Sequence, residues 1–217
     1  MINSTVILST AYLPPIQYFA KILAYPKVLV ETQETYSKQS YRNRCVILSC
    51  NGPLPLTIPV VKTNGNNTSI KDIAIDYSTD WQKNHWKAIE SAYRTSAYYD
   101  FVADLLIPFY RKKEKYLFDF NSEVTSELTG FLGINKQLLN SNEYLKNYPE
   151  GIDDYRKSIH PKPQFQRTDN DFTPIKYFQV FSDRFNFYPN LSIADLLFNE
   201  GLNSLKIIEN STIKNLP

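Results

Sequence analysis

The sequence contains few of the residues that most often mark catalytic and metal sites. Of its 217 residues, only 2 are histidine, 2 cysteine, 1 methionine and 6 glycine. The two histidines, His85 and His160, lie far apart in the chain, and there is no paired-cysteine motif and no His-x-x-x-His. Because zinc and related metals need several such ligands, usually at short spacing, the sequence predicts no metal site.

Glycine-rich phosphate-binding loops are also missing. The sequence has neither a Walker loop nor a G-x-G-x-x-G motif, and the glycine pair Gly130 and Gly133 has the pattern of a helix end. A bound nucleotide would have to be held by side chains or by an ordinary helix N-terminus. The sequence therefore identifies no cofactor.

Long hydrophobic runs and a strong charge of one sign are missing as well. No apolar stretch approaches the roughly 20 residues of a membrane span, and Pro14 and Pro15 interrupt the apolar start of the chain. We therefore expect no membrane span, no signal peptide and a cytoplasmic location. The 24 Lys and Arg residues balance 22 Asp and Glu residues to a net charge of +2, which favours no nucleic-acid partner.

The two cysteines do not predict a disulfide. Cys45 and Cys50 are separated by an odd number of positions in a predicted strand, which places them on opposite faces. They are either reduced cysteines in or near the core, or Cys45 is a nucleophile whose thiol pKa is lowered by the neighbouring Arg44.

The composition is otherwise typical of a folded domain rich in aromatic residues. Hydrophobic residues make up 42% and charged residues 21%, with 16 tyrosines and 13 phenylalanines, and we expect a single domain over residues 1–217. The beginning of the chain predicts a βαβ unit. A buried strand at 6–9 leads to a helix at 16–24, which Pro15 opens, and a second strand follows at 28–30.

A β-hairpin and several helices are predicted after the βαβ unit. Strands at 45–49 and 54–61 flank the turn signal Asn51-Gly52. The further predicted elements are a short strand through Ile70, Ile73 and Ile75, helices beginning at Asp80 and covering 98–110 and 124–132, loops at 141–175, a strand at 177–181, and a last helix between the N-cap Ser192 and Gly201, with Asp195 as capping-box partner. The predicted fold class is α/β, with an N-terminal βαβ unit, a β-hairpin and several packed helices around a mixed sheet.

Residues 36–44 hold the densest group of basic side chains. Lys38, Arg42 and Arg44 would share one face of an extended segment, because their positions differ by even numbers. Guanidinium groups suit phosphate and carboxylate ligands. The segment is either a solvated polar loop or an anion-binding strip, and it is where we expect a phosphate clamp.

A second candidate site is the turn between the first strand and the first helix, residues 9–18. Ligands of α/β sheets collect beyond the carboxyl ends of strands, near such turns. Tyr12, Gln17 and Tyr18 are the hydrogen-bonding side chains available there. The alternative interpretation is aromatic packing that makes the turn rigid.

His85 is the better catalytic candidate of the two histidines. It shares a helical stripe with Trp81 and Ile89, which predicts that it points inward. It is either a core histidine held by one hydrogen bond or a general acid or base, because imidazole titrates near neutral pH. His160 lies in the loop-rich stretch 141–175.

Taken together, these segments resemble the WbqC-like protein family. The matching stretches occur in the family's order, cover most of the chain and comprise residues 12–19, 36–44, 53–60, 81–93 and 189–198.

The chain also departs from the family's pattern. The family commonly has Gln-Pro after the first strand and a glycine before Tyr-Phe, where this chain has Ser9-Thr10 and Gln17. It also lacks the glycine-rich segment that many members carry in their second half. The resemblance therefore implies no particular cofactor. Lys38, Asn43, Arg44 and His85 do match the family's pattern.

The resemblance implies a function in bacterial surface-polysaccharide biosynthesis, especially of O-antigen, as a sugar-modifying transferase. On this hypothesis the partner is a small-molecule anionic activated sugar or acyl donor. Its binding residues would be Lys38, Arg42 and Arg44, together with Tyr12, Tyr18 and Asn43, and His85 would be the catalytic base. The alternative is a non-catalytic partner or scaffold protein for glycan-synthesis enzymes, because tyrosine is enriched at interfaces, and the sequence leaves a homo-oligomer open.

Overall fold

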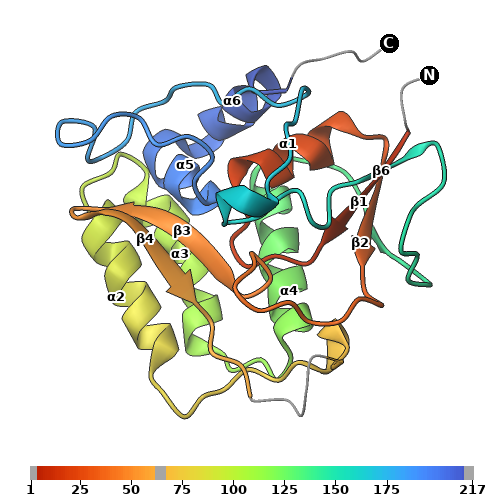
Figure 1. Ribbon diagram of the computed structural model, residues 1–217. Helices are drawn as coiled ribbons and strands as arrows, with labels where there is room; N and C mark the ends of the chain where they lie inside the picture. The colour runs from red at the N-terminus through yellow and green to blue at the C-terminus, as the bar shows by residue number, and fades with distance from the viewer. Residues whose placement is uncertain (1–3, 62–66, 213–217) are drawn as a thin grey trace.

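The βαβ unit predicted at the start of the chain is confirmed in the computed structural model, which describes residues 4–61 and 67–212 (Figure 1). β1 (Thr5–Ser9) and β2 (Lys27–Glu31) pair in parallel, and α1 (Ile16–Ala24) connects them. β1 is buried on both faces, which is why its sequence is a continuous apolar run. Pro15 precedes α1 with a φ of −68°, the angle that the proline ring imposes and that a helix start needs.

The parallel sheet has four strands in the order β5-β2-β1-β6. β5 (Leu138–Asn140) pairs with β2, and β6 (Ile152–Asp154) pairs with β1. The chain builds the sheet from β1 through β2 to β5 and then crosses to β6 on the other side of β1. Such a reversal leaves a crevice at the carboxyl ends of the two strands involved, here β1 and β6, and this is where α/β folds bind ligands.

The β-hairpin is a separate antiparallel pair of strands. β3 (Arg44–Ser49) and β4 (Gly52–Thr57) lie on the side of the molecule away from β6 (Figure 1). Gly52 follows the two-residue turn with a φ of 101°, which favours glycine. Cys45 is buried, Cys50 is exposed and both are free, as their spacing predicts.

Helices cover the sheet and the hairpin and complete the predicted α/β fold. They are α2 (Trp81–Tyr93), α3 (Tyr99–Arg111), α4 (Leu117–Phe131), α5 (Ile193–Glu200) and α6 (Ser204–Asn210), with the short 3-10 turns η1 (Ile70–Asp72), η2 (Pro163–Phe165) and η3 (Gly201–Asn203). α2 packs on β3, whereas α1 packs on α5 and α6 (Figure 1). No helix within the described ranges is both long enough and apolar enough to cross a membrane.

Two predicted strands are wrong. Residues 177–181 are irregular backbone, and Tyr177 is buried because its hydroxyl donates a hydrogen bond to Asp195 Oδ2 at 2.6 Å. The strand predicted through Ile70 and Ile75 is the 3-10 turn η1 followed by two isolated bridges, at Ala74 and Ile75. Tyr177 and the isoleucines of 70–75 are thus buried by packing rather than by strand pairing, while Phe178 is exposed.

Two predicted helix features also need correction. The helix predicted at 124–132 begins earlier, at Leu117. The prediction missed its first turns because α4 is buried on more than one face and shows no single apolar stripe there. Ser192 does cap α5 by accepting from the Ala194 N–H, and Gly201 ends it, as predicted. Asp195, however, is not a capping-box partner, because its carboxylate accepts hydrogen bonds from tyrosine hydroxyls instead.

Candidate functional site

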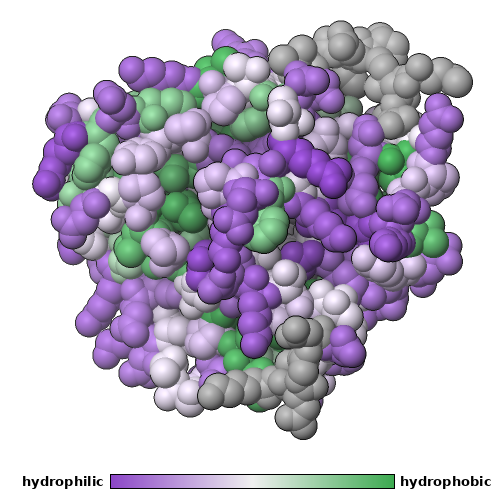
Figure 2. Space-filling model, in the orientation of Figure 1, coloured by the Kyte–Doolittle hydropathy of each residue, from purple (hydrophilic) through white to green (hydrophobic). Residues whose placement is uncertain are grey.

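A cleft of about 680 Å³ lies beyond the carboxyl ends of β1 and β6. We call it the basic cleft, because the described residues that line it include six Lys and Arg side chains and one carboxylate, that of Glu34. The six cations are Lys38, Arg42, Arg156, Lys157, Lys162 and Arg167. Figure 2 shows strongly hydrophilic residues gathered across the middle of the face that carries η2, the short teal helical turn near the centre of Figure 1.

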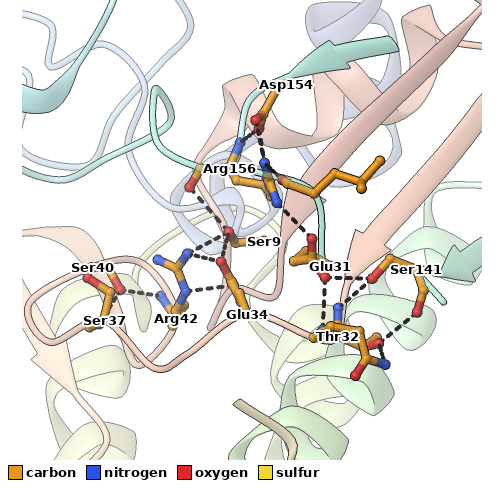
Figure 3. Close-up of polar contacts among 12 residues, drawn as sticks. Ser9, Glu31, Thr32, Glu34, Ser37, Ser40, Arg42, Ser141, Asp154 and Arg156 are labelled. Carbon is orange, nitrogen blue, oxygen red and sulfur yellow. Dashed lines mark hydrogen bonds and ion pairs between the residues drawn. The ribbon is translucent and has the colours of Figure 1, made fainter. Parts of the chain in front are cut away.

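Arg42 forms the floor of the basic cleft beside β1. Its Nε donates to Glu34 Oε1 at 2.8 Å, and its Nη2 donates to Ser9 Oγ at 2.7 Å and to Glu34 Oε2 (Figure 3). Ser9 is the last residue of β1, and its Oγ lies 3.2 Å from the carbonyl oxygen of Arg156. The buried guanidinium therefore ties the segment 34–42 to the strand end, and Glu34 balances its charge.

Arg156 has the corresponding position after β6. Its Nε and Nη2 donate to the Asp154 carboxylate at 2.9 and 2.6 Å, and its Nη1 donates to Glu31 Oε2 at 2.8 Å (Figure 3). The Tyr148 and Tyr144 rings lie over the guanidinium, with centroids at 4.7 and 5.0 Å. Glu31 ends β2 and is fully buried, so this network joins the ends of β2 and β6 and is part of the folded framework.

The cations at the rim of the basic cleft differ from Arg42 and Arg156, because no acidic side chain balances their charge among the described residues. Lys38, Lys157 and Arg167 are exposed and form no ion pair within the described part of the chain. Lys162 Nζ donates to the side-chain oxygen of Gln39. A concave surface with an excess of one charge sign concentrates ligands of the opposite sign, so this cleft favours phosphate or carboxylate groups.

His160 is the histidine that lines the basic cleft. Its Nδ1 accepts a hydrogen bond from the Lys162 backbone N–H at 3.0 Å, and its ring packs edge-on against Phe165, with centroids 4.7 Å apart. Burial lowers the pKa of His160, and the charges of Arg42 and Lys162 act in the same direction, while the backbone hydrogen bond opposes them. The ring is therefore neutral at pH 7 and carries its proton on Nε2.

The loop that carries these residues is attached to α1 through Asp169. Lys21 Nζ donates to Asp169 Oδ1 at 2.7 Å, Gln17 Nε2 donates to Asp169 Oδ2 at 2.7 Å, and the Tyr155 hydroxyl lies 3.3 Å from Oδ1. Lys21 is almost completely buried, so this ion pair fixes the loop firmly. Gln17, one of the side chains available for ligands in the turn 9–18, is used here to hold the wall of the cleft.

The three basic residues predicted to share one face, Lys38, Arg42 and Arg44, do not lie together in the structure. Residues 36–44 are not extended but turn at Gln39, whose φ is 56°. Lys38 and Arg42 line the basic cleft, whereas Arg44 lies on β3 and its Nε donates to Thr57 Oγ1 at 3.0 Å. The argument from even spacing therefore does not apply to Arg44.

The other predicted binding residues, Asn43 and Tyr18, are absent from the lining of the basic cleft. Asn43 is buried and its Nδ2 donates to the Ile58 carbonyl oxygen at 2.8 Å. The Tyr18 hydroxyl donates to the Ser9 carbonyl oxygen at 3.0 Å, and Tyr18 lines a gap of about 10 Å³ that also contacts Arg42 and Arg156. A gap of that size holds about one water molecule, so Tyr18 supports the strand end next to the cleft.

His85 lies in an aromatic cluster instead. The Tyr12 hydroxyl is 3.0 Å from His85 Nδ1 and 2.7 Å from the Tyr110 hydroxyl, and Trp81 packs edge-on against the imidazole at 5.1 Å. Burial lowers the pKa of His85 to about 4, and a backbone hydrogen bond with Thr57 acts in the opposite direction. The imidazole is thus neutral and internally bonded, and it is absent from the lining of the basic cleft.

The sequence predictions missed the second wall of the cleft, which runs from Arg156 to Arg167. This wall lies in the stretch 141–175, where prolines break every periodic pattern. One signal was available, because residues 156–167 contain four Lys or Arg residues and no acidic residue. That local charge excess resembles the one in 36–44, and the fold brings the two segments together.

Fold and site together define an α/β protein with a cation-rich cleft at the reversal point of a parallel sheet. Comparison with known proteins identifies the family of this protein. The chain matches the WbqC-like protein family over residues 10–155, more than half of its length, and it belongs to that family. The match includes Lys38 and Arg42 but ends before Arg156, so it covers the first wall of the basic cleft and not the second.

One curated relative is also similar in sequence. The chain is 31% identical over 139 residues to "Uncharacterized protein Rv1507c" of Mycobacterium tuberculosis, strain H37Rv. The match covers 64% of this chain and 60% of the relative, so it spans less than two thirds of that protein. No solved structure matches the chain.

Proposed function

We propose that the basic cleft binds the anionic part of an activated sugar or acyl donor, and that the protein is a transferase of surface-polysaccharide biosynthesis of the O-antigen type. The observation that supports donor binding is the group of exposed cations Lys38, Lys157 and Arg167, which form no ion pair among the described residues and line a cleft at the reversal point of the sheet. The biosynthetic role rests on the resemblance to the WbqC-like family.

The side chains of the basic cleft divide into two groups. Arg42 and Arg156 are buried and already bonded, so they shape the floor, whereas Lys38, Lys157 and Arg167 are free to contact phosphate oxygens. A volume of about 680 Å³ suits a ligand as large as a nucleotide. The ring of Phe165, which is half exposed, offers a flat face for the rest of the donor.

We assign to His160, rather than to the predicted base His85, a hydrogen bond to the donor. His160 lines the basic cleft, and its Nδ1 lone pair is used by the Lys162 backbone N–H, so the ring presents its Nε2–H to an anionic oxygen of the donor. A pKa of about 4 makes His85 a weak base, and its Nδ1 is bonded to Tyr12.

The binding step is tested by thermal unfolding with inorganic pyrophosphate, UDP and coenzyme A added separately. A ligand that binds the folded state raises Tm, and we expect at least one of the three to do so in the wild type. The increase should be lost in Lys38→Ala and Arg167→Ala. The matched control is Lys87→Ala, an exposed lysine on α2 outside the cleft. No stabilisation by any ligand, or an equal loss in the control, contradicts the proposal.

The transfer step needs a readout in cells. A strain lacking the gene is complemented with wild type, Lys38→Ala or Lys87→Ala, and its surface glycan is analysed by mass spectrometry. We expect wild type and Lys87→Ala to restore the glycan and Lys38→Ala to fail at equal protein level. Restoration by all three proteins argues against a transferase that uses the basic cleft.

A non-catalytic scaffold is the second candidate function. Phe101, Phe178 and Leu202 are large apolar side chains that are more than half exposed, as expected at an interaction surface. Absence of any ligand stabilisation, together with a stable protein partner lost on Phe101→Ser, would favour the scaffold over the transferase.

A further inference from the structure

A second cleft, of about 500 Å³, lies between α4 and the ends of β2 and β5. We call it the α4 cleft. Val30, Leu138 and Asn140 line it from the strands. The helix contributes Phe118, Asn121, Ser122, Thr125, Ser126 and Thr129. These positions recur every three or four residues, so they form one face of α4.

This face of α4 is polar although much of it is buried. Asn121, Thr125 and Thr129 are at most 6% exposed, while the core face of the same helix carries apolar side chains such as Leu128. Buried polar groups cost free energy unless they are bonded, and Asn and Thr are weaker helix formers than Leu or Ala. Asn121 has a structural role through its Nδ2, but helix propensity does not explain the row of Ser and Thr hydroxyls, which a polar ligand would use.

The hydrogen bonds on this face leave mainly acceptors for a ligand. Ser122 Oγ donates to the Phe118 carbonyl oxygen at 2.8 Å, and Thr129 Oγ1 donates to the Ser126 carbonyl oxygen at 2.8 Å. Both hydroxyl protons are used, and lone pairs remain. Asn121 Nδ2 donates to the Arg42 carbonyl oxygen at 2.7 Å, while its buried Oδ1 has no partner among the described residues.

The α4 cleft lacks the charge excess of the basic cleft. Its lysine, Lys136, donates from Nζ to the carbonyl oxygens of Leu23 and Tyr25 and so stabilises the C-terminal end of α1. Asp119 is exposed at the rim. An anion therefore gains little here, and a neutral molecule with many hydrogen-bond donors fits best.

We propose that the α4 cleft binds a neutral, hydroxyl-rich ligand of the size of a hexose unit. Hydroxyl groups would donate to the Ser and Thr oxygens of α4, and the C–H face of a sugar ring would lie on Phe118. This inference rests on the chemistry of the cleft and holds independently of the transfer reaction proposed above.

The position of the α4 cleft links it to the basic cleft. Thr10 and Tyr18 line both the α4 cleft and the gap of about 10 Å³, and that gap shares Arg42 with the basic cleft. Asn121 also holds the Arg42 carbonyl oxygen. The two clefts thus flank the segment after β1, so a neutral acceptor and an anionic donor could be bound side by side.

Backbone-amide NMR tests the proposal with three probes: D-glucose, D-galactose and N-acetyl-D-glucosamine. We expect at least one sugar to shift the amide resonances of residues 118–129 and 138–140. Ser126→Trp, which fills the cleft from an exposed position, should weaken this binding at least about tenfold. The matched control is Glu127→Trp, which adds the same ring at an exposed position of α4 outside the cleft lining.

Each other outcome overturns the inference. It is wrong if no sugar shifts these resonances, if the shifts map to the basic cleft, or if Ser126→Trp and Glu127→Trp weaken binding equally. Lys38→Ala separates this inference from the proposed donor site, because it should abolish stabilisation by pyrophosphate and leave the sugar-induced shifts unchanged.

Discussion

His85 and His160 are surrounded by different kinds of groups. His85 is buried among the rings of Tyr12 and Trp81, with one ring nitrogen bonded to a hydroxyl that is itself bonded to Tyr110. His160 lines a cleft of about 680 Å³, bonded through Nδ1 to a backbone N–H and packed on a ring that is half exposed.

The cations of the basic cleft also fall into two groups, those bonded within the fold and those left exposed to a ligand. Arg156 makes four hydrogen bonds to Asp154, Glu31 and a backbone oxygen, whereas its neighbour Lys157 is exposed and forms no ion pair within the described residues. A group whose hydrogen-bonding capacity is used within the fold stabilises that fold. A group with capacity left beside a cavity is available to a ligand, and residue type alone does not distinguish the two.

The largest expected effect comes from breaking the buried network. Arg156→Ala leaves the carboxylate of Glu31 buried without its cation, so the free energy of unfolding should fall by about 3–5 kcal/mol. Chemical denaturation measures this change. Lys157→Ala, one position further on, should leave stability unchanged and weaken pyrophosphate binding. Equal stability of the two variants would remove the distinction between bonded and available cations.

A second effect, of about 3 kcal/mol, comes from the pKa of His85. Burial lowers this pKa from 6.5 to about 4, so between these values the unfolded chain binds a proton that the folded chain does not. Stability due to His85 is therefore lost as the pH falls from 6.5 to about 4. Asp195 acts in the opposite sense, because burial raises its pKa from 3.8 to about 6. Its contribution is lost as the pH rises through that range.

Single variants separate these two opposing contributions. In His85→Phe, denaturation between pH 4 and 6 should show stability falling as the pH rises, because the Asp195 effect then exceeds the opposing effect of the less buried His160. In Asp195→Asn, stability should fall as the pH is lowered. Parallel pH profiles for the two variants would contradict the opposite contributions of His85 and Asp195.

Much of the fold could be predicted from sequence because local rules govern it. The run at Val6 to Leu8, the proline at Pro15 and the turn at Asn51-Gly52 each determine an element through burial or backbone geometry, and each element forms. Tyr177 shows where this fails. Its apolar neighbourhood resembles a strand, but a hydrogen bond to Asp195 positions it, and no local pattern reveals such a distant partner.

The candidate site was only half predictable for the same reason. Lys38 and Arg42 could be found from the charge cluster that contains them. The opposite wall at Arg156 and His160 lies more than a hundred residues further along the chain, in a stretch without periodicity, and it reaches the cleft through the pairing of β6 with β1. His85 was correctly predicted to point inward, but an inward direction does not distinguish a core from a cavity.

The smallest effects come from exchanging the two histidines for uncharged side chains. His85→Phe removes the partner of the Tyr12 hydroxyl and should cost about 1–3 kcal/mol of stability, while pyrophosphate affinity stays unchanged because His85 is outside the cleft lining. His160→Gln should leave stability unchanged, since the ring lies at the cleft surface, and should weaken pyrophosphate binding several-fold. Denaturation and calorimetric titration on both variants measure the two quantities. The opposite pattern, with affinity lost in His85→Phe alone, would move the donor contact from His160 to His85.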